Sequence, residues 1–238
     1  MARKQKPADP FFDDGFPSKK QQKPLLTVGS VGFKTKKQLK YYESINENVI
    51  TISTGVAGTG KTFVAVYAAC QALASGEVDK IVMTKPVVEV GDSMGFLPGD
   101  MEEKMGPYIR SVEECFTAII GEQGLNNLYA KKKLEILPMN FMRGLTLKDC
   151  FVIADEMQNA SYEQTKALLT RIGEDAVYVL NGDVEQSDLK GRSGLPAAVE
   201  ILKDIDGVGL VDFTVDDIVR SDILKDIIIS YHNYEKTK

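Results

Sequence analysis

Histidine is nearly absent from this chain of 238 residues, which contains only His232. A single imidazole cannot supply a histidine triad or a multi-histidine metal site, so any chemistry must depend on carboxylates, amides, lysines and arginines. Cysteine is also scarce, because only Cys70, Cys115 and Cys150 are present and they are widely spaced. Three scattered cysteines predict buried thiols in a reducing cytoplasm and argue against a disulfide framework or a zinc site.

Long apolar runs are missing as well. No stretch approaches the ~20 apolar residues of a membrane-spanning helix, and no signal-peptide pattern opens the chain. We therefore expect a cytoplasmic protein without a membrane contact. The length suits one sizeable α/β domain and is too short for two full ones.

The charge is distributed unevenly. The net charge of −5 argues against a wholly basic nucleic-acid coat, but residues 1–40 carry a net +7 and the remaining chain a net −12. Residues 1–34 hold four prolines and little periodicity, which predicts a flexible basic arm before a domain at 35–238. The arm could pair with nucleic-acid phosphates and stack on bases, or it could be a solubilising tail or a strap onto a neighbouring subunit. The basic and aromatic residues concerned are Arg3, Lys4, Lys6, Phe11, Phe12, Phe16, Lys19, Lys20 and Lys23.

Short apolar segments alternate with helical segments along the rest of the chain. Such alternation is typical of an α/β fold in which helices cover both faces of a parallel sheet. The predicted strands are 49–53, 80–85, 134–137, 150–154, 176–180 and 207–213. The predicted helices are 35–47, 63–73, 101–120, 124–133, 161–172, 194–204 and 215–231, with Thr35 and Ser161 as N-caps.

Residues 55–62 fit the phosphate-binding loop G-x-x-x-x-G-K-[ST]. A predicted strand precedes the loop and an apolar helix follows it, which is the context that the motif requires. This turn brings backbone N–H groups and a helix N-terminus to one point, where an anion is favoured. Lys61 is expected to reach the β- and γ-phosphates of a nucleoside triphosphate, and the Thr62 hydroxyl to hold Mg²⁺. The predicted binding loop is Gly55, Val56, Ala57, Gly58, Thr59, Gly60, Lys61 and Thr62.

Polar side chains follow two further predicted strands. Asp155, Glu156 and Gln158 come directly after one of them, and Gln186 lies shortly after the next. Because the carboxyl ends of parallel strands share an edge with the phosphate loop, we expect these residues in a common pocket. Asp155 would hold the Mg²⁺ shell, Glu156 would polarise an attacking water, and Gln158 would sense the γ-phosphate. Gln186 would hydrogen-bond a γ-phosphate oxygen or the attacking water.

Taken together, these motifs resemble the PhoH-like family of phosphate-starvation-inducible ATPases. The resemblance covers about residues 35–232 and rests on GVAGTGKT, TKPVVEVGDSMGFLPGD, ADEMQNA, QTKALLTRIG and NGDVEQSDLKGRSGL. It implies a single RecA-like P-loop NTPase domain, similar to the motor core of superfamily 1 helicases, with ATP and Mg²⁺ as cofactors. It also implies a homo-oligomer, a hexameric ring, with a role on RNA or single-stranded nucleic acid. Met157 stands where the family more often has alanine, which we interpret as a packing change.

The resemblance also implies roles outside the core motifs. Gln38 is expected to read adenine through its amide, unless it is one more surface glutamine. Thr84, Lys85 and the loop 89–100 resemble the segment that contacts single-stranded nucleic acid, with a plain surface loop as the alternative.

An arginine finger is expected from a ring neighbour, because a single domain leaves the nucleotide open on one side. Arg220 is the first candidate, and Arg143 and Arg171 follow. Each of the three could instead form a helix-surface ion pair.

The leading hypothesis is an Mg²⁺-dependent ATPase in which Glu156 and Gln186 orient a water for in-line attack on the γ-phosphate. Lys61, Mg²⁺ and an arginine would offset the charge that develops there. One alternative is a small-molecule phosphotransferase, although residues 101–133 offer only Arg110 for an arginine-rich lid. Another is a nucleotide-gated binding module, a scaffold with slow hydrolysis.

The short length is similar to virus-encoded members of the family, so we expect a bacteriophage source and no strand-cutting ribonuclease domain.

Overall fold

The centre of the molecule is a parallel sheet. Its strands are β1 (Ile50–Gly55), β2 (Lys80–Lys85), β3 (Leu134–Pro138), β4 (Cys150–Ala154), β5 (Val177–Asn181) and β6 (Val208–Phe213). Their order across the sheet is β3-β2-β4-β5-β1-β6, and every neighbouring pair is parallel. Because β5 lies between β1 and β4, the carboxyl ends of these three strands meet at one place on the edge of the sheet.

The structure is a computed structural model, and it describes residues 26–86, 101–142, 144–184, 186–187, 193–220 and 222–236. Three sequence predictions therefore concern residues outside the described part of the chain. They are the arm up to residue 25, the loop 89–100 and Arg143.

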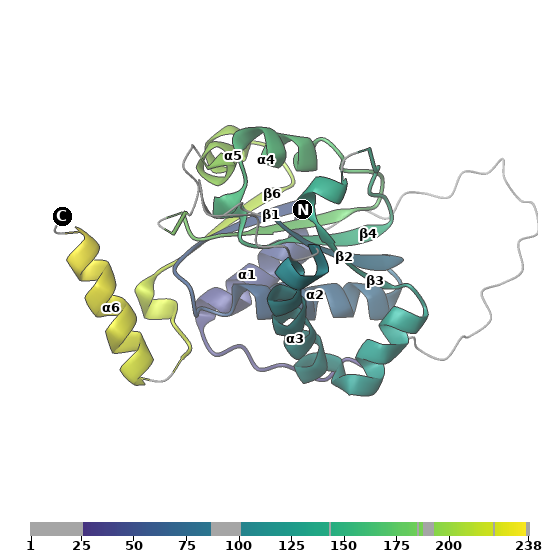
Figure 1. Ribbon diagram of the computed structural model, residues 1–238, viewed down its shortest axis with the longest axis horizontal. Helices are drawn as coiled ribbons and strands as arrows, with labels where there is room; N and C mark the ends of the chain where they lie inside the picture. The colour runs from purple at the N-terminus through teal and green to yellow at the C-terminus, as the bar shows by residue number, and fades with distance from the viewer. Residues whose placement is uncertain are drawn as a thin grey trace, which may run out of the picture.

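Helices cover both faces of the sheet (Figure 1). On one face, α1 (Lys36–Glu47), α2 (Lys61–Ser75) and α3 (Met101–Ala130) pack over a large apolar cluster. On the other face, α4 (Tyr162–Leu169) and α5 (Gly194–Leu202) pack over a smaller one, together with the 3₁₀ turns η1 (Met139–Met142) and η2 (Met157–Asn159). Every residue of β4 and β5 is buried, which is why these segments are apolar in sequence apart from Asn181 at the end of β5. The expected α/β fold with a covered parallel sheet is confirmed.

Local signals placed most helix boundaries correctly. Thr35 caps α1 by accepting a hydrogen bond from the Gln38 backbone N–H, and Ser161 forms a capping box with Gln164 at the start of α4. The break expected between two helices near residue 121 is present, because Gly121 has φ 71° and ψ 165° inside the segment assigned to α3.

The predicted final helix at 215–231 is wrong in its first half. The chain instead forms the 3₁₀ turn η3 (Val215–Asp217) and enters α6 only at Asp222 (Asp222–Lys236). The backbone N–H of Val219 donates to the carbonyl oxygen of Gly58 at 3.0 Å, so a contact with the phosphate loop replaces the helical hydrogen bonding expected here. Figure 1 shows α6 standing apart from the main body.

The described end of the predicted arm, residues 26–34, lies against the body of the protein. Leu26 is buried, and Val28, Val31 and Phe33 pack against the larger apolar cluster. The Gly29 backbone N–H also donates to the carbonyl oxygen of Ile119 in α3. In the described part of the chain, no helix combines the length and apolar character that crossing a membrane requires.

Candidate active site

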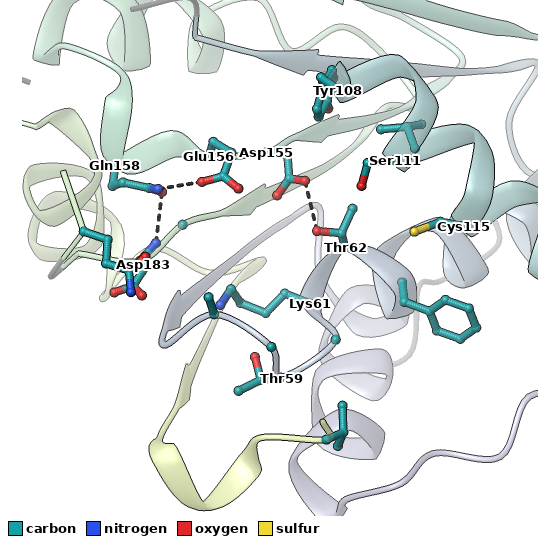
Figure 2. A pocket seen from close by; sticks show the side chains of 18 of the residues that line it. Thr59, Lys61, Thr62, Tyr108, Ser111, Cys115, Asp155, Glu156, Gln158 and Asp183 are labelled. Atoms are coloured by element: carbon teal, nitrogen blue, oxygen red, sulfur yellow. Dashed lines mark hydrogen bonds between the residues drawn. The ribbon is translucent and has the colours of Figure 1, made fainter. Parts of the chain in front are cut away.

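A pocket of about 370 Å³ lies at the carboxyl edge of the sheet, where β1, β5 and β4 end side by side (Figure 2). The loop after β1, the start of α2, one side of α3 and the segments after β4, β5 and η3 form its walls. The sequence-predicted residues that line it are Ala57, Gly58, Thr59, Gly60, Lys61, Thr62, Asp155, Glu156, Gln158, Gln186 and Arg220. Gly55 and Val56 lie at the base of the same loop, and Gln38 is not among the lining residues.

Two glycines give the loop its shape. Gly55 has φ +107°, and a Cβ there would overlap the Phe213 carbonyl oxygen on the neighbouring strand β6. Gly60 is left-handed at φ 83° and ends the loop as the N-cap of α2, where no side chain caps the helix. The first-turn N–H groups of α2 are therefore left for an anion, and the helix dipole favours one there.

Lys61 is bonded to the loop itself. Its Nζ donates to the carbonyl oxygens of Gly55 at 2.6 Å and Val56 at 2.9 Å. Burial lowers the pKa of Lys61, while the carboxylates of Asp183 and Asp155 act in the opposite direction. A bound polyphosphate would give this half-buried ammonium a charged partner in place of two neutral carbonyls.

Thr62 and Asp155 meet across the pocket (Figure 2). The Thr62 hydroxyl donates to Asp155 Oδ2 at 2.9 Å. Burial, together with the neighbouring charge of Glu156, raises the pKa of Asp155 to about 6. A hydroxyl and a desolvated carboxylate are oxygen donors of the kind that hold Mg²⁺, which is usually bound by one or two protein carboxylates plus phosphates. The donor set therefore fits the expected cation.

Glu156 has an unusual backbone conformation. Its φ of 55° and ψ of 37° are left-handed, which is uncommon for a residue other than glycine and is found most often at functional sites. The side chain is exposed to the pocket and accepts a hydrogen bond from Gln158 Nε2 at 2.6 Å. Gln158 Oε1 in turn accepts from the Asp183 backbone N–H at 3.0 Å (Figure 2). The buried amide of Gln158 thus ties the end of β4 to the end of β5.

Gln186 and Arg220 reach the pocket from two different segments. Gln186 is exposed, and its backbone N–H donates to the carbonyl oxygen of Asp183. Arg220 follows Val219, which is bonded to Gly58, and its Cγ would lie 3.2 Å from a Cβ at Gly58. Arg220 therefore lies beside the phosphate loop of its own chain. The prediction from the sequence was an arginine finger that acts in the site of a neighbouring subunit.

Two other predicted residues lie away from the pocket lining. Arg171 donates through Nε to the Met142 carbonyl oxygen and through Nη1 to that of Ala167, so it ties η1 to α4. Gln38 is buried behind the loop, where Nε2 donates to the Thr59 carbonyl oxygen and Oε1 accepts from the Lys34 backbone N–H. Its predicted role in reading adenine stays a prediction. In this structure the amide supports the loop from behind.

Sequence reasoning missed the wall that α3 contributes. Tyr108, Ser111, Val112 and Cys115 line the pocket at a spacing of three or four residues, which is one face of a helix. That periodicity was visible, but an apolar core stripe gives the same signal. Burial raises the pKa of the Cys115 thiol to about 11, so this cysteine is protonated at neutral pH and is a poor nucleophile.

Tyr108 also connects the pocket with the segment expected to contact nucleic acid. Its hydroxyl donates to the carbonyl oxygen of Thr84 at 3.4 Å, and the Lys85 ammonium lies 4.6 Å from its ring centroid. Thr84 is fully buried, so it cannot contact a nucleic-acid strand directly. Such a contact would have to be made by Lys85 and the residues that follow it.

Comparison with known proteins gives a consistent family. The family model described as PhoH-like protein matches residues 30–232. A PhoH-like protein of Bacillus subtilis (strain 168) is 42% identical over 204 residues, which cover 85% of this chain and 64% of that protein. Protein PhoH of Escherichia coli (strain K12) is 37% identical over 198 residues, which cover 82% of this chain and 56% of that protein. The chain thus spans about three fifths of the length of these relatives. Both are bacterial and lend no support to the expected bacteriophage source.

Among solved structures, the large terminase of a thermophilic bacteriophage in complex with ADP has a TM-score of 0.52 to this chain. The two are 14% identical, and the match covers 81% of this chain and 48% of that one. At this identity the likeness concerns the fold alone, and it agrees with the expected α/β fold built on a parallel sheet.

Proposed function

This chain belongs to the PhoH-like family and is a P-loop NTPase, and from that premise we propose that it binds ATP with Mg²⁺ and hydrolyses it. The observation that carries the proposal is the convergence of Lys61, Thr62 and Asp155 with Glu156 in one pocket at the end of three adjacent strands. The structurally similar terminase was solved in complex with ADP, which supports nucleotide binding by this chain.

Binding would begin at the phosphate loop. The uncapped first turn of α2 presents backbone N–H groups to the β- and γ-phosphates, and Lys61 exchanges its two carbonyl partners for phosphate oxygens. Thr62 and Asp155 would hold Mg²⁺, which supplies positive charge at the phosphates when it is bound. Charge neutralisation at the buried Asp155 carboxylate then favours binding of the metal together with the nucleotide.

Hydrolysis would use the polar groups beyond the metal site. Glu156 is exposed to the pocket and is held by Gln158, so it can orient a water for in-line attack on the γ-phosphate. Gln186 lines the same pocket and would fix the water or a γ-phosphate oxygen from the side of β5. Arg220, beside Gly58 of its own chain, would offset the charge that develops on the transferred phosphoryl group.

We further propose that the hydrolysis cycle acts on RNA or single-stranded nucleic acid and that the active form is a hexameric ring. Tyr108 lines the nucleotide pocket and contacts Lys85, which lies in the segment expected to bind nucleic acid. This contact supports a coupling between the bound nucleotide and the bound nucleic acid. The basic residues of the arm supply further charge for a polyanion.

Two substitutions test the ATPase proposal. Lys61→Ala removes the phosphate-binding ammonium and is expected to weaken ATP binding and abolish turnover. Glu156→Gln keeps the shape of the side chain and its partner Gln158, so it is expected to retain ATP binding while turnover falls by roughly 10²- to 10⁴-fold. ATP binding is measured by equilibrium titration and turnover by phosphate release.

Matched controls are Lys166→Ala and Glu122→Gln, which make the same changes at exposed helix positions away from the pocket. Full turnover in Lys61→Ala and Glu156→Gln would overturn the site assignment. Phosphate release only when a small-molecule acceptor is added would identify a phosphotransferase instead. Slow turnover indifferent to every nucleic acid would favour the scaffold alternative over a motor.

A further inference from the structure

A second hollow, of about 380 Å³, lies at the opposite edge of the sheet from the nucleotide pocket. It is formed by the turns that lead into β2, β3 and β4, so it lies where these parallel strands begin. The two sites share only β4, which is five residues long, so they lie at least roughly 17 Å apart along the strand direction. The lining residues are Asp79, Lys80, Lys131, Lys132, Lys133, Thr146, Lys148 and Asp149.

The hollow is basic although residues 41–238 carry a net −12. Five lysines and two aspartates line it, a net +3. Lys80 is paired with Glu135 at 2.8 Å, but the other four lysines form no ion pair with any described residue. Lys131, Lys132 and Lys148 are exposed and Lys133 is half-buried. Four ammonium groups are thus gathered at one place, and no described carboxylate forms a salt bridge with them.

The backbone that carries these lysines is fixed. Lys132 and Asp149 have φ values of 53° and 50°, a left-handed conformation that is uncommon outside glycine and tends to occur at functional sites. The Lys133 backbone N–H donates to the Leu128 carbonyl oxygen at 2.8 Å, and the Asp79 N–H to that of Asp149 at 2.7 Å. Backbone hydrogen bonds thus hold the turns before β2 and β3, while the exposed side chains of Lys131, Lys132 and Lys148 can adapt to a ligand.

The size and composition of the hollow favour a chain of phosphates over a single small anion. Three adjacent strands span about 10 Å, which exceeds the reach of one phosphate group. Lysine acts as a point charge on a flexible stem and contacts phosphate without fixed geometry. No aromatic residue is among the lining residues, so bases would not stack here.

We infer that this hollow binds the phosphate backbone of a nucleic-acid strand, in a contact that does not depend on sequence. The inference rests on the nucleic-acid part of the proposed function and adds a site on the far side of the sheet from ATP. A strand held here would be anchored to the protein independently of the nucleotide state.

The test is a titration of a fluorescent single-stranded RNA oligonucleotide into the full chain at several salt concentrations, followed by anisotropy. Lys131→Gln/Lys148→Gln removes two exposed ammonium groups without changing Lys132, whose backbone is left-handed. Loss of two phosphate contacts is expected to reduce the slope of log K against log salt by about 1.4, and to weaken binding roughly 10- to 100-fold at 50 mM salt. Turnover of ATP without RNA is expected to be unchanged.

The control is Lys40→Gln/Lys166→Gln, which removes the same charge from exposed positions on α1 and α4 and is expected to leave the salt slope unaltered. An equal loss in both double variants would overturn the inference, since net charge alone would explain it. So would an unchanged slope in Lys131→Gln/Lys148→Gln, which would leave the proposed function intact. Failure of the unmodified chain to bind RNA would overturn both this inference and the nucleic-acid part of the proposed function. The ATPase part of the proposed function is tested separately by the ATP turnover of the unmodified chain. A change in molar mass by light scattering, with RNA binding intact, would identify the hollow as a contact between copies.

Discussion

The two edges of the sheet in this protein handle charge in opposite ways. At the carboxyl edge, five charged residues of both signs line the pocket, and most are buried or hydrogen-bonded, as in the Thr62–Asp155 pair and the bonds of Lys61 to its own loop. At the amino edge, four lysines stand around an open hollow without salt bridges to described residues. Of the strands that end at the pocket (β1, β5 and β4) and those that begin at the hollow (β2, β3 and β4), only β4 runs from one site to the other.

The difference follows from what each edge would have to bind. A compact, highly charged triphosphate with its metal calls for a few groups in fixed positions, because burial strengthens each interaction and misplacement is costly. A long polyanion calls for many weak contacts that adapt, because its affinity comes from the number of phosphates neutralised. The contrast predicts that substitutions at the carboxyl edge will have larger effects than equivalent ones at the amino edge.

The largest expected effect is on turnover. Arg220→Ala is expected to lower the turnover number by roughly 10³-fold or more, because the charge developing on the γ-phosphate loses its arginine. Lys148→Ala, at the amino edge, is expected to leave turnover without RNA unchanged. Both are measured by phosphate release at saturating ATP.

Mixing two inactive variants then shows whether Arg220 acts in the pocket of its own chain or in that of a neighbouring chain. Because Arg220 lies beside Gly58 of its own chain, a mixture of Arg220→Ala and Lys61→Ala is expected to stay inactive. Recovery of turnover in the mixture would mean that one chain lends its arginine to the intact loop of another, as the sequence resemblance implied.

A smaller but still large effect is expected on stability. Gly55→Ala forces a Cβ into the Phe213 carbonyl oxygen at φ +107° and is expected to lower the free energy of unfolding by roughly 3–5 kcal/mol. Gly76→Ala has a similar strained φ of +76° at the end of α2 but meets nothing within 4 Å, so about 1–2 kcal/mol is expected. Urea denaturation measures both. Equal losses would mean that backbone strain alone, and not the close packing of β1 on β6, accounts for the stability lost in Gly55→Ala.

A smaller effect, a gain of stability, is expected at Asp155. The folded chain holds the Asp155 proton more tightly than the unfolded chain, because its pKa is raised to about 6 from 3.8. That contribution is complete below pH 4 and is lost as the pH rises through 6, so the neutral Asp155→Asn becomes the more stable form above it, by about 1–3 kcal/mol.

Thermal unfolding at pH 4 and pH 7.5 without nucleotide measures this gain, and a gain that is equal at both values would contradict the assigned cause. Adding Mg²⁺ and ATP at pH 7.5 is expected to stabilise the unmodified chain more than Asp155→Asn. Lys80→Met, which breaks the partly exposed pair with Glu135 at the amino edge, is expected to change stability by less than about 1 kcal/mol.

Much of this arrangement was predictable from the sequence because its causes are local. Apolar runs marked the strands, Thr35 and Ser161 marked helix starts, and polar residues after β4 and β5 marked the pocket. Each of these signals depends on a residue and its near neighbours in the chain. Predicting the pocket from them required only the rule that parallel strands end at one edge of the sheet.

The unpredicted parts depend on contacts between distant segments. Asp216 and Asp217 after Thr214 have the composition of a helix start, but the bond from Val219 to Gly58 interrupts the helix there. At the amino edge, the consecutive lysines 131–133 are joined by the sequence-distant Lys80 and Lys148 only through the order β3-β2-β4. No local pattern distinguishes these cases from ordinary surface charges.

The bond between Val219 and Gly58 has a mechanical consequence. Among the described elements α6 packs mainly on η3, so its position depends on the short segment that this bond fixes to the phosphate loop. A helix of 15 residues is about 22 Å long, so a tilt of about 10° at its base would move its far end by about 4 Å. If Gly58 shifts and Val219 follows it, we expect the far end of α6 to move by a larger distance than Gly58 itself.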